Sequence, residues 1–122
     1  MRVLIAGKQA TLRYALKTLL QTRPGLQITG TAVNQEQLFV QLKNDCPDLL
    51  LLDEELSSKL VDEVIVPIGR LDPRPIVVVL GDGMESRKVC LYAGVEACIS
   101  KGGPPKDLST AIEVVRLRRK NV

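Results

Sequence analysis

The sequence predicts one α/β domain in which a parallel, doubly wound β-sheet carries helices on both faces. Two short apolar runs, Leu49–Leu52 and Ile76–Leu80, lack polar alternation, which is typical of strands buried on both faces. Segments with apolar residues at helical spacing alternate with the predicted strands, and repeated βα units favour a parallel sheet. The length of 122 residues suits a single domain over residues 1–122.

The first half of the chain supplies two strands and two helices before the first buried run. Arg2–Ala6 is a short apolar strand, and leucines at helical spacing follow it as far as Arg23–Gly25, where a proline and a glycine end the helix. Leu26–Val33 alternates mildly, as expected for a strand nearer the edge of the sheet. Asn34 then caps a helix that is expected to run to about Asn44.

The second half is expected to complete five strands and five helices. A helix is predicted within Glu54–Leu71, although Pro67 should break or kink it. After the second buried run, Glu85–Ala93 is predicted to be a short helix closed by a glycine, and Val95–Ser100 to be the fifth strand. The proline pair that follows begins the last helix, whose apolar residues again recur at helical spacing.

The composition excludes several classes of function. Because the chain has no histidine, His-based zinc sites, Ser-His-Asp or Cys-His catalysis and phosphohistidine transfer are excluded. A net charge of +3 and 2% aromatic residues give no broad basic surface and no stacking platform for nucleic acid. Cys46, Cys90 and Cys98 have apolar neighbours and no CxxC spacing, so we expect buried reduced thiols. No apolar run could span a bilayer and no signal peptide is evident, so we expect a cytoplasmic protein.

The residues that follow the predicted strands form the candidate site. Ligands of open parallel sheets bind at the carboxyl ends of the strands. Those ends carry Gly7 and Lys8 after the first strand, Asp53 after the third, Gly81 after the fourth and Lys101 after the fifth. The sequence is therefore expected to bring one carboxylate and two ammonium groups to a common edge of the sheet.

This arrangement resembles the receiver domain of bacterial two-component response regulators over essentially the whole chain. The matching segments, in receiver order and near receiver spacing, are VLIAGKQATLRYALKTLL, PDLLLLDEEL, PIVVVLG, YAGVEACISK and PPKDLSTAI. The stretch LYAGVEACISKGGPPKDLSTAI is most similar to receivers joined to LuxR-type helix-turn-helix domains. The resemblance implies a flavodoxin-like fold with a five-stranded parallel sheet in the order 2-1-3-4-5.

The resemblance also implies roles for individual positions. In receivers, an acidic pair after the first strand and an aspartate after the third bind magnesium, and the aspartate accepts a phosphoryl group. A hydroxyl residue after the fourth strand and a lysine after the fifth contact that phosphoryl group. By position, Asp53 matches the phosphoacceptor and Lys101 matches the lysine.

The chain departs from the receiver pattern at the remaining positions. The acidic pair falls on Gly7 and Lys8, the hydroxyl residue on Gly81, and the aromatic switch residue on Cys98. Replacing a carboxylate by an ammonium removes a magnesium ligand and puts a positive charge beside the ion. We therefore expect no cofactor, a lost magnesium site and no phosphorylation. Lys8 is instead expected to pair with Asp53, with Lys101 as a second partner.

The favoured function is a non-enzymatic signalling module, an atypical pseudo-receiver that works independently of phosphorylation through protein contacts. The alternative is a phosphorylatable receiver of a phosphorelay, with Asp53 as phosphoacceptor, a rearranged metal site that uses Glu54 or Glu55, and control of a transcriptional output. On the first interpretation these two glutamates form a solvated edge. A small enzyme or cofactor binder of flavodoxin-like fold has no nucleophile–base pair to support it. Lys8 as a plain surface charge is the remaining alternative to its pairing.

A protein partner or a second copy is expected on the face formed by helix 85–93, the fifth strand and the last helix. This is the output surface of the receivers that the chain resembles, and here it is expected to include Arg87, Leu91, Cys98 and Arg116. A DNA-binding output domain beyond Val122 would fit the LuxR-type resemblance. The basic tail by itself does not predict nucleic-acid binding, because the helix dipole favours cations at a helix C-terminus anyway.

Overall fold

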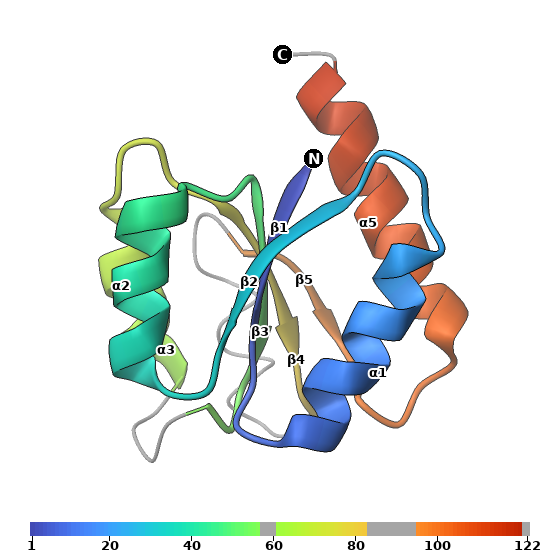
Figure 1. Cartoon of the computed structure of the whole chain (residues 1–122), viewed down its shortest axis with the longest axis horizontal. Helices are drawn as coiled ribbons and strands as arrows, with labels where there is room; N and C mark the ends of the chain where they lie inside the picture. The colour runs from blue at the N-terminus through green and yellow to red at the C-terminus, as the bar shows by residue number, and fades with distance from the viewer. Residues whose placement is uncertain (57–60, 83–94, 121–122) are drawn as a thin grey trace.

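The computed structural model describes residues 1–56, 61–82 and 95–120, and within them it confirms the predicted α/β architecture (Figure 1). The described elements, in chain order, are β1 (Arg2–Ala6), α1 (Ala10–Gln21), β2 (Gln27–Ala32), α2 (Gln35–Asp45), β3 (Leu49–Asp53), α3 (Val61–Gly69), β4 (Ile76–Leu80), β5 (Val95–Ile99) and α5 (Pro105–Lys120). β1 and β4 have the predicted bounds, whereas β2 is shorter by one residue at each end and β5 by one at its end. The helix predicted over Glu85–Ala93 lies outside the described residues.

The described strands form one parallel sheet in the order β2-β1-β3-β4-β5, which confirms the order that the resemblance implies. β3 lies at the centre, where Leu51 is paired with Ile5 of β1 and with Val78 of β4. β2 forms an edge, as its mild alternation predicted. Because the strands are parallel, their carboxyl ends all lie along the same edge of the sheet.

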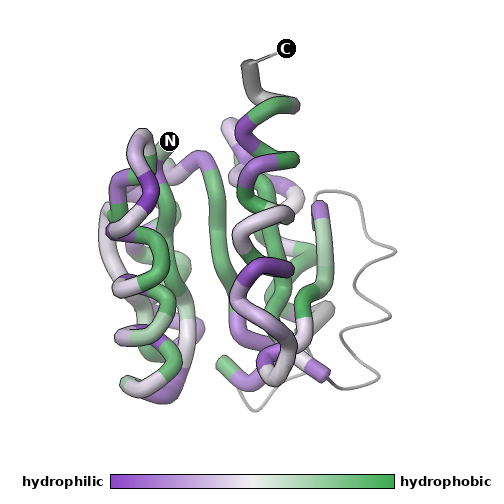
Figure 2. Tube along the Cα trace, turned by 90° about the vertical axis from the view of Figure 1, so that its right-hand side faces the viewer, coloured by the Kyte–Doolittle hydropathy of each residue, from purple (hydrophilic) through white to green (hydrophobic). Residues whose placement is uncertain are grey.

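Helices cover both faces of the sheet, with α2 and α3 on one side and α1 and α5 on the other (Figure 1). Alternate residues of β3 point to opposite faces. Leu50 and Leu52 pack in the core beneath α2 and α3, whereas Leu49 and Leu51 pack beneath α1 and α5. All four leucines are 0% exposed, and hydrophobic colouring accordingly runs along the central strands in Figure 2. Burial on two faces is therefore the physical reason for the continuous leucine run.

α2 begins and ends with local hydrogen bonds. Asn34 Oδ1 accepts a 2.8 Å bond from the amide of Gln37, and Gln37 Oε1 accepts a 3.0 Å bond from the amide of Val33. This reciprocal pattern gives partners to two amides at the start of the helix, and it confirms Asn34 as the predicted cap. At the other end, Cys46 has a left-handed backbone with φ 45°, and its amide bonds to the carbonyl of Leu42. Cys46 is a free, exposed thiol, so the expectation of a buried cysteine is wrong here, because helix termination places this residue at the surface.

α3 contains Pro67 without breaking at it. The helix spans Val61–Gly69, so it continues for two residues past the proline. The amides of Arg70 and Leu71 bond to the carbonyls of Pro67 and Ile68, at 3.2 and 3.1 Å, which closes the helix with short-range turns. The proline therefore marks the last turn of the helix, where the lost backbone donor disturbs few hydrogen bonds.

α5 is amphipathic along the sheet. Its inward residues Leu108, Ile112 and Val115 are buried, as predicted. Its outer side exposes Val114 and Leu117, at 40% and 60% of their surface. In the part of the chain that the structure describes, no helix is both long and apolar enough to cross a bilayer.

Candidate functional site

The loops that follow the strands are held together at the carboxyl edge of the sheet. The amide of Glu54 donates to the carbonyl of Leu80 at 2.9 Å, and the amide of Gly81 donates to the carbonyl of Ile99 at 3.0 Å. These bonds extend the pairing of β3, β4 and β5 by one residue beyond the strands. Asp53 is thereby fixed beside the loops that follow β4 and β5, as the sequence predicted.

Asp53 forms a buried ion pair with Lys101. The Lys101 Nζ lies 2.5 Å from Asp53 Oδ1, and the Asp53 side chain is 1% exposed while that of Lys101 is 24% exposed. The same Oδ1 accepts a 3.0 Å hydrogen bond from the amide of Glu55. Lys101 Nζ also lies 3.2 Å from Glu55 Oε2, whose side chain is 65% exposed. One ammonium therefore bridges a buried and an exposed carboxylate.

The pKa of Lys101 reflects this environment. Burial lowers the pKa of Lys101, but the hydrogen bond and charge of Asp53, together with those of Glu55, outweigh the effect of burial. The net result is a pKa of Lys101 above its ordinary value. Lys101 is therefore a firmly held cation at neutral pH.

The second oxygen of Asp53 is less well satisfied. Oδ2 is buried and has no hydrogen-bond partner among the described residues. A buried acceptor without a donor typically costs about 1–3 kcal/mol of stability. The ion pair with Lys101 consequently compensates only one of the two carboxylate oxygens of Asp53.

The loop after β1 contributes its backbone and not a carboxylate. Arg13 Nη1 donates to the carbonyls of Gly7 and Lys8, at 2.8 and 2.9 Å, and so fixes the loop. Lys8 is exposed, and among the contacts of the described residues it makes no ion pair with Asp53, so that part of the prediction is wrong. Arg13 was not anticipated; its place in the first turn of the helix after the loop is the signal that could have identified it.

The position of Gly7 has room for a side chain. A Cβ there would lie 3.6 Å from Leu12, 3.7 Å from Arg13 and 3.8 Å from the Cβ of Asp53, which are ordinary contacts. Packing therefore does not require glycine at this position. The lack of a carboxylate beside Asp53 is a difference in chemistry and not a steric necessity.

The loops after β4 and β5 are joined by polar contacts that the sequence did not suggest. Gly81 is buried and offers no hydroxyl group. Ser100 Oγ donates to the carboxylate of Asp82, and it accepts a 3.2 Å bond from the amide of Gly102. The amide of Asp82 in turn donates to Glu54 Oε1 at 3.1 Å. The residues after β3, β4 and β5 thus form one connected polar cluster.

Cys98, the expected switch position, lies in β5 and is half-buried against the core beneath α2 and α3. It is disulfide-bonded, so the expectation of a reduced thiol is wrong at this position. Apolar neighbours in the sequence indicated burial, and they carry no information on whether a second sulfur lies within bonding distance. Cys90 lies outside the described residues.

The loop after β1 supplies no carboxylate ligand for a magnesium ion beside Asp53. Magnesium prefers an octahedral shell of oxygen ligands. Asp53 has one oxygen held by the ammonium of Lys101, and Gly7 and Lys8 supply no carboxylate. Among the residues that the structure describes, no group of three or more acidic, cysteine or histidine side chains is arranged to hold a metal.

Asp53 and Lys101 are predicted to be energetically coupled. Removing one partner of a buried ion pair typically costs about 3–5 kcal/mol, because the other charge stays buried without compensation. Lys101→Ala should therefore be strongly destabilising. The double mutant Lys101→Ala/Asp53→Ala should lose less stability than the sum of the losses in the two single mutants. We expect a coupling energy of about 0.5–3 kcal/mol from urea melts of the four proteins of this double-mutant cycle.

Lys8 supplies the matched control for that cycle. It is a lysine at the same edge of the sheet, but its side chain is exposed. Lys8→Ala and Asp53→Ala should add to within about 0.5 kcal/mol. Additive effects at Lys101 combined with strong coupling at Lys8 would transfer the role of counter-ion to Lys8.

The raised pKa of Lys101 predicts a stability contribution that disappears in alkali. A lysine whose pKa is higher in the folded state contributes fully below its unfolded pKa, about 10.4, and loses that contribution as the pH rises through the folded pKa. The difference in unfolding free energy between the wild-type chain and Lys101→Met should be constant from about pH 7 to 9 and shrink above about pH 10.4. Urea melts at several pH values measure it, and a difference unchanged in alkali would contradict the assignment.

No protein-family model matches the chain. Among curated proteins, it is 28% identical over 118 residues to a protein-glutamate methylesterase/protein-glutamine glutaminase of Halalkalibacterium halodurans, covering 94% of this chain and 34% of that protein. It is 36% identical over 79 residues to the group 3 operon protein of the same name from Bradyrhizobium diazoefficiens, covering 65% of this chain and 21% of that protein. The chain spans about a third of the length of the curated relatives that it matches.

Solved structures match over nearly the whole chain. The response regulatory domain of protein mrkE from Klebsiella pneumoniae superposes with a TM-score of 0.90 at 16% identity, covering 100% of both chains. RcsB from Salmonella enterica, bound to promoter rprA, gives a TM-score of 0.85 at 21% identity, covering 95% of this chain and 61% of RcsB. A LuxR-family DNA-binding response regulator from Staphylococcus aureus gives 0.81 at 20% identity, covering 93% and 97% of the two chains. The likeness is one of fold, and it confirms the resemblance at that level: this chain has the fold of the response-regulator receiver domains.

Proposed function

We propose that the chain is a signalling module of the receiver type that works without phosphorylation and acts through protein contacts. The observation that carries the proposal is the burial of Asp53, whose side chain is 1% exposed, beside a loop after β1 in which Gly7 and Lys8 supply no carboxylate. A phosphoacceptor needs an accessible carboxylate oxygen and a cation that neutralises the charge of the transferring group. In this chain Lys101 supplies a cation, but the carboxylate is buried and the loop after β1 offers no ligand for a metal.

The shortage of magnesium ligands around Asp53 supports the same proposal. Magnesium stabilises the transferring phosphoryl group by bridging its oxygens, and it needs a shell of oxygen ligands to be held. Gly7 supplies no ligand and Lys8 supplies a positive charge. An unassisted transfer to Asp53 would lack its main electrostatic stabilisation.

The alternative function, a phosphorylatable receiver with Asp53 as phosphoacceptor, has one observation in its favour. Asp53 Oδ2 has no hydrogen-bond partner among the described residues, so one oxygen is chemically free. A metal site built from Glu54 or Glu55 would have to form beside it. Glu55 is bound to Lys101 at 3.2 Å, which works against such a rearrangement.

We propose a non-enzymatic role and a cytoplasmic location for the chain. The names of the curated relatives describe whole proteins of which the chain spans about a third, so their methylesterase and glutaminase activities are not transferred to it. The absence of histidine supports a non-enzymatic role, since most nucleophile–base pairs use one. A DNA-binding output domain beyond Val122 is part of the proposal, and it is supported by solved neighbours described as DNA-binding LuxR-family regulators.

The first test of this function is a metal and phosphodonor assay. A calorimetric titration with magnesium should show no saturable binding, because the ligand set is incomplete. Incubation with acetyl phosphate should leave the mass of the intact protein unchanged. Saturable magnesium binding together with a phosphoryl adduct that is lost in Asp53→Asn would overturn the proposal and establish the alternative.

The described residues of α5 indicate which part of this helix could contact a protein partner. Arg116, which the expected output surface includes, bonds to Glu113 at 3.3 Å through its guanidinium and lies against Gly25, near the end of α1. The outer side of α5 instead exposes Val114 and Leu117. Two large apolar side chains one turn apart on a surface helix are suited to contact with a protein. Arg87 and Leu91 lie outside the described residues.

We predict that self-association or partner binding depends on this face. Light scattering across a range of concentrations should show association that is weakened by Leu117→Glu and by Leu91→Glu. Val40→Glu is the matched control, because Val40 is equally apolar, 58% exposed and located on α2. An assembly that is indifferent to the first two changes and sensitive to the control would move the interface to α2.

A further inference from the structure

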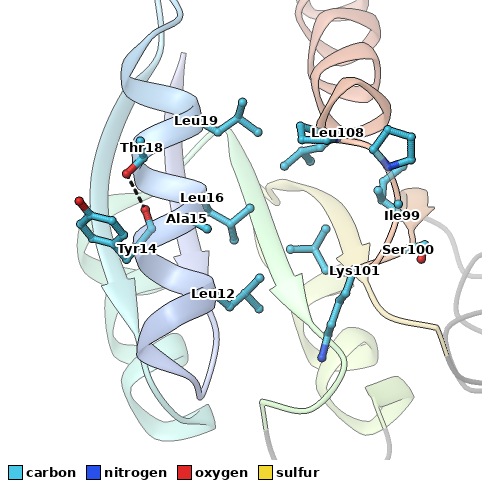
Figure 3. A pocket seen from close by; sticks show the side chains of 14 residues that line it. Leu12, Tyr14, Ala15, Leu16, Thr18, Leu19, Ile99, Ser100, Lys101 and Leu108 are labelled. Atoms are coloured by element: carbon cyan, nitrogen blue, oxygen red, sulfur yellow. Dashed lines mark hydrogen bonds between the residues drawn. The ribbon is translucent and has the colours of Figure 1, made fainter.

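A pocket of about 520 Å³ lies between α1 and the start of α5, and it shares Ser100 and Lys101 with the site already described. Figure 3 shows Leu12, Leu16 and Leu19 pointing from α1 toward Leu108, with Lys101 at the lower end. The remaining lining is Tyr14, Ala15, Thr18, Leu80, Ile99, Ser100, Gly103, Pro104 and Pro105. Its size falls within the range of about 300–1,000 Å³ that is usual for small-molecule sites.

The polar side chains in this lining are already engaged elsewhere. Thr18 Oγ1 donates to the carbonyl of Tyr14 at 3.0 Å, and the ring of Tyr14 points away from the pocket (Figure 3). Ser100 Oγ donates to Asp82, and the ammonium of Lys101 is shared by two carboxylates. Few side-chain donors or acceptors in the lining are therefore left to bond to the body of a ligand. The walls therefore suit a molecule whose body is apolar.

The lower end of the pocket carries an excess of negative charge. Lys101 is the lining residue there, and it is in contact with Asp53 and Glu55, while the lining residue Ser100 is bonded to Asp82. The ammonium of Lys101 thus contacts two carboxylates directly, and a third carboxylate is bonded to the neighbouring Ser100. The start of α5 carries a partial positive charge, and the side-chain charges of Lys106 and Asp107 in its first turn oppose one another. A cationic end group is favoured over an anionic one.

We propose that this α1–α5 pocket binds a small apolar molecule with one amine end. The apolar body lies between the leucines of α1 and Leu108, and the ammonium lies at the lower end within reach of the exposed Glu55. Burying the body displaces water from apolar walls, which provides the affinity. The carboxylates select the sign of the end group. This inference stands on the pocket alone and does not require the proposed function.

Octylamine, 1-octanol and octanoate test the proposal, because they share one chain and differ in the charge of the end. Amide spectra of the labelled chain should show saturable shifts at Leu12, Leu19, Ile99 and Leu108, with octylamine binding about two- to fivefold more tightly than octanol, the equivalent of an exposed ion pair. Octanoate should bind most weakly. The net charge of +3 would favour octanoate if binding were non-specific, so the order of affinities reports the local site.

Two substitutions locate the ligand. Ala15→Phe fills the pocket from an exposed position on α1 and should weaken all three probes about tenfold or more, which corresponds to about 1.4 kcal/mol. Val40→Phe, on α2, is the matched control and should change nothing. Glu55→Gln should remove the advantage of octylamine over octanol while leaving octanol unaffected. Circular dichroism of each variant confirms that it is folded.

Several results would overturn the proposal. Shifts that do not saturate, or that survive Ala15→Phe, would mean that the probes bind elsewhere. Equal or tighter binding of octanoate would exclude the amine. A dimer that dissociates in Ala15→Phe would show that a second copy occupies the pocket in place of a small molecule.

Discussion

The ion pair between Asp53 and Lys101 is the interaction on which the chemistry of this edge depends. β3 is buried on both faces, so its last residue leaves the sheet in a region with little water. A carboxylate in such a place must be compensated by a charge or by donors. Lys101 supplies the charge from the end of β5, two strands away in the sheet, and so ties the loop after β3 to the loop after β5.

Much of the fold could be predicted from the sequence because the strands follow from simple burial. The continuous runs of β3 and β4, with polar turns between them, leave few alternatives to a parallel sheet with helices on both faces. The loops at the carboxyl edge follow from the same topology. These features depend on the period of apolar residues and on chain direction, and neither requires knowledge of side-chain conformation.

The partners within the site could not be predicted in the same way. Lys8 and Lys101 both follow strands that lie near Asp53, and the sequence does not tell which of two long side chains turns inward. Arg13 holds the loop of Lys8 through backbone carbonyls, a use that leaves no sequence motif. The contact of Ser100 with Asp82 likewise depends on how two loops approach in space. Cys46 was expected to be buried, but it stands between Asp45 and Pro47 and its backbone ends α2 at the surface.

Lys101 contributes to two sites, because its ammonium pairs with Asp53 and the residue also lines the pocket between α1 and α5. A residue shared in this way would link ligand binding in the pocket to the state of Asp53. Any molecule whose binding favoured one position of the Lys101 side chain would alter the free energy of the carboxylate, and by thermodynamic reciprocity any change at Asp53 would alter the affinity of that molecule by the same factor. The side chain of Lys101 alone would therefore connect occupancy of the pocket with the charge balance at the carboxyl edge of the sheet.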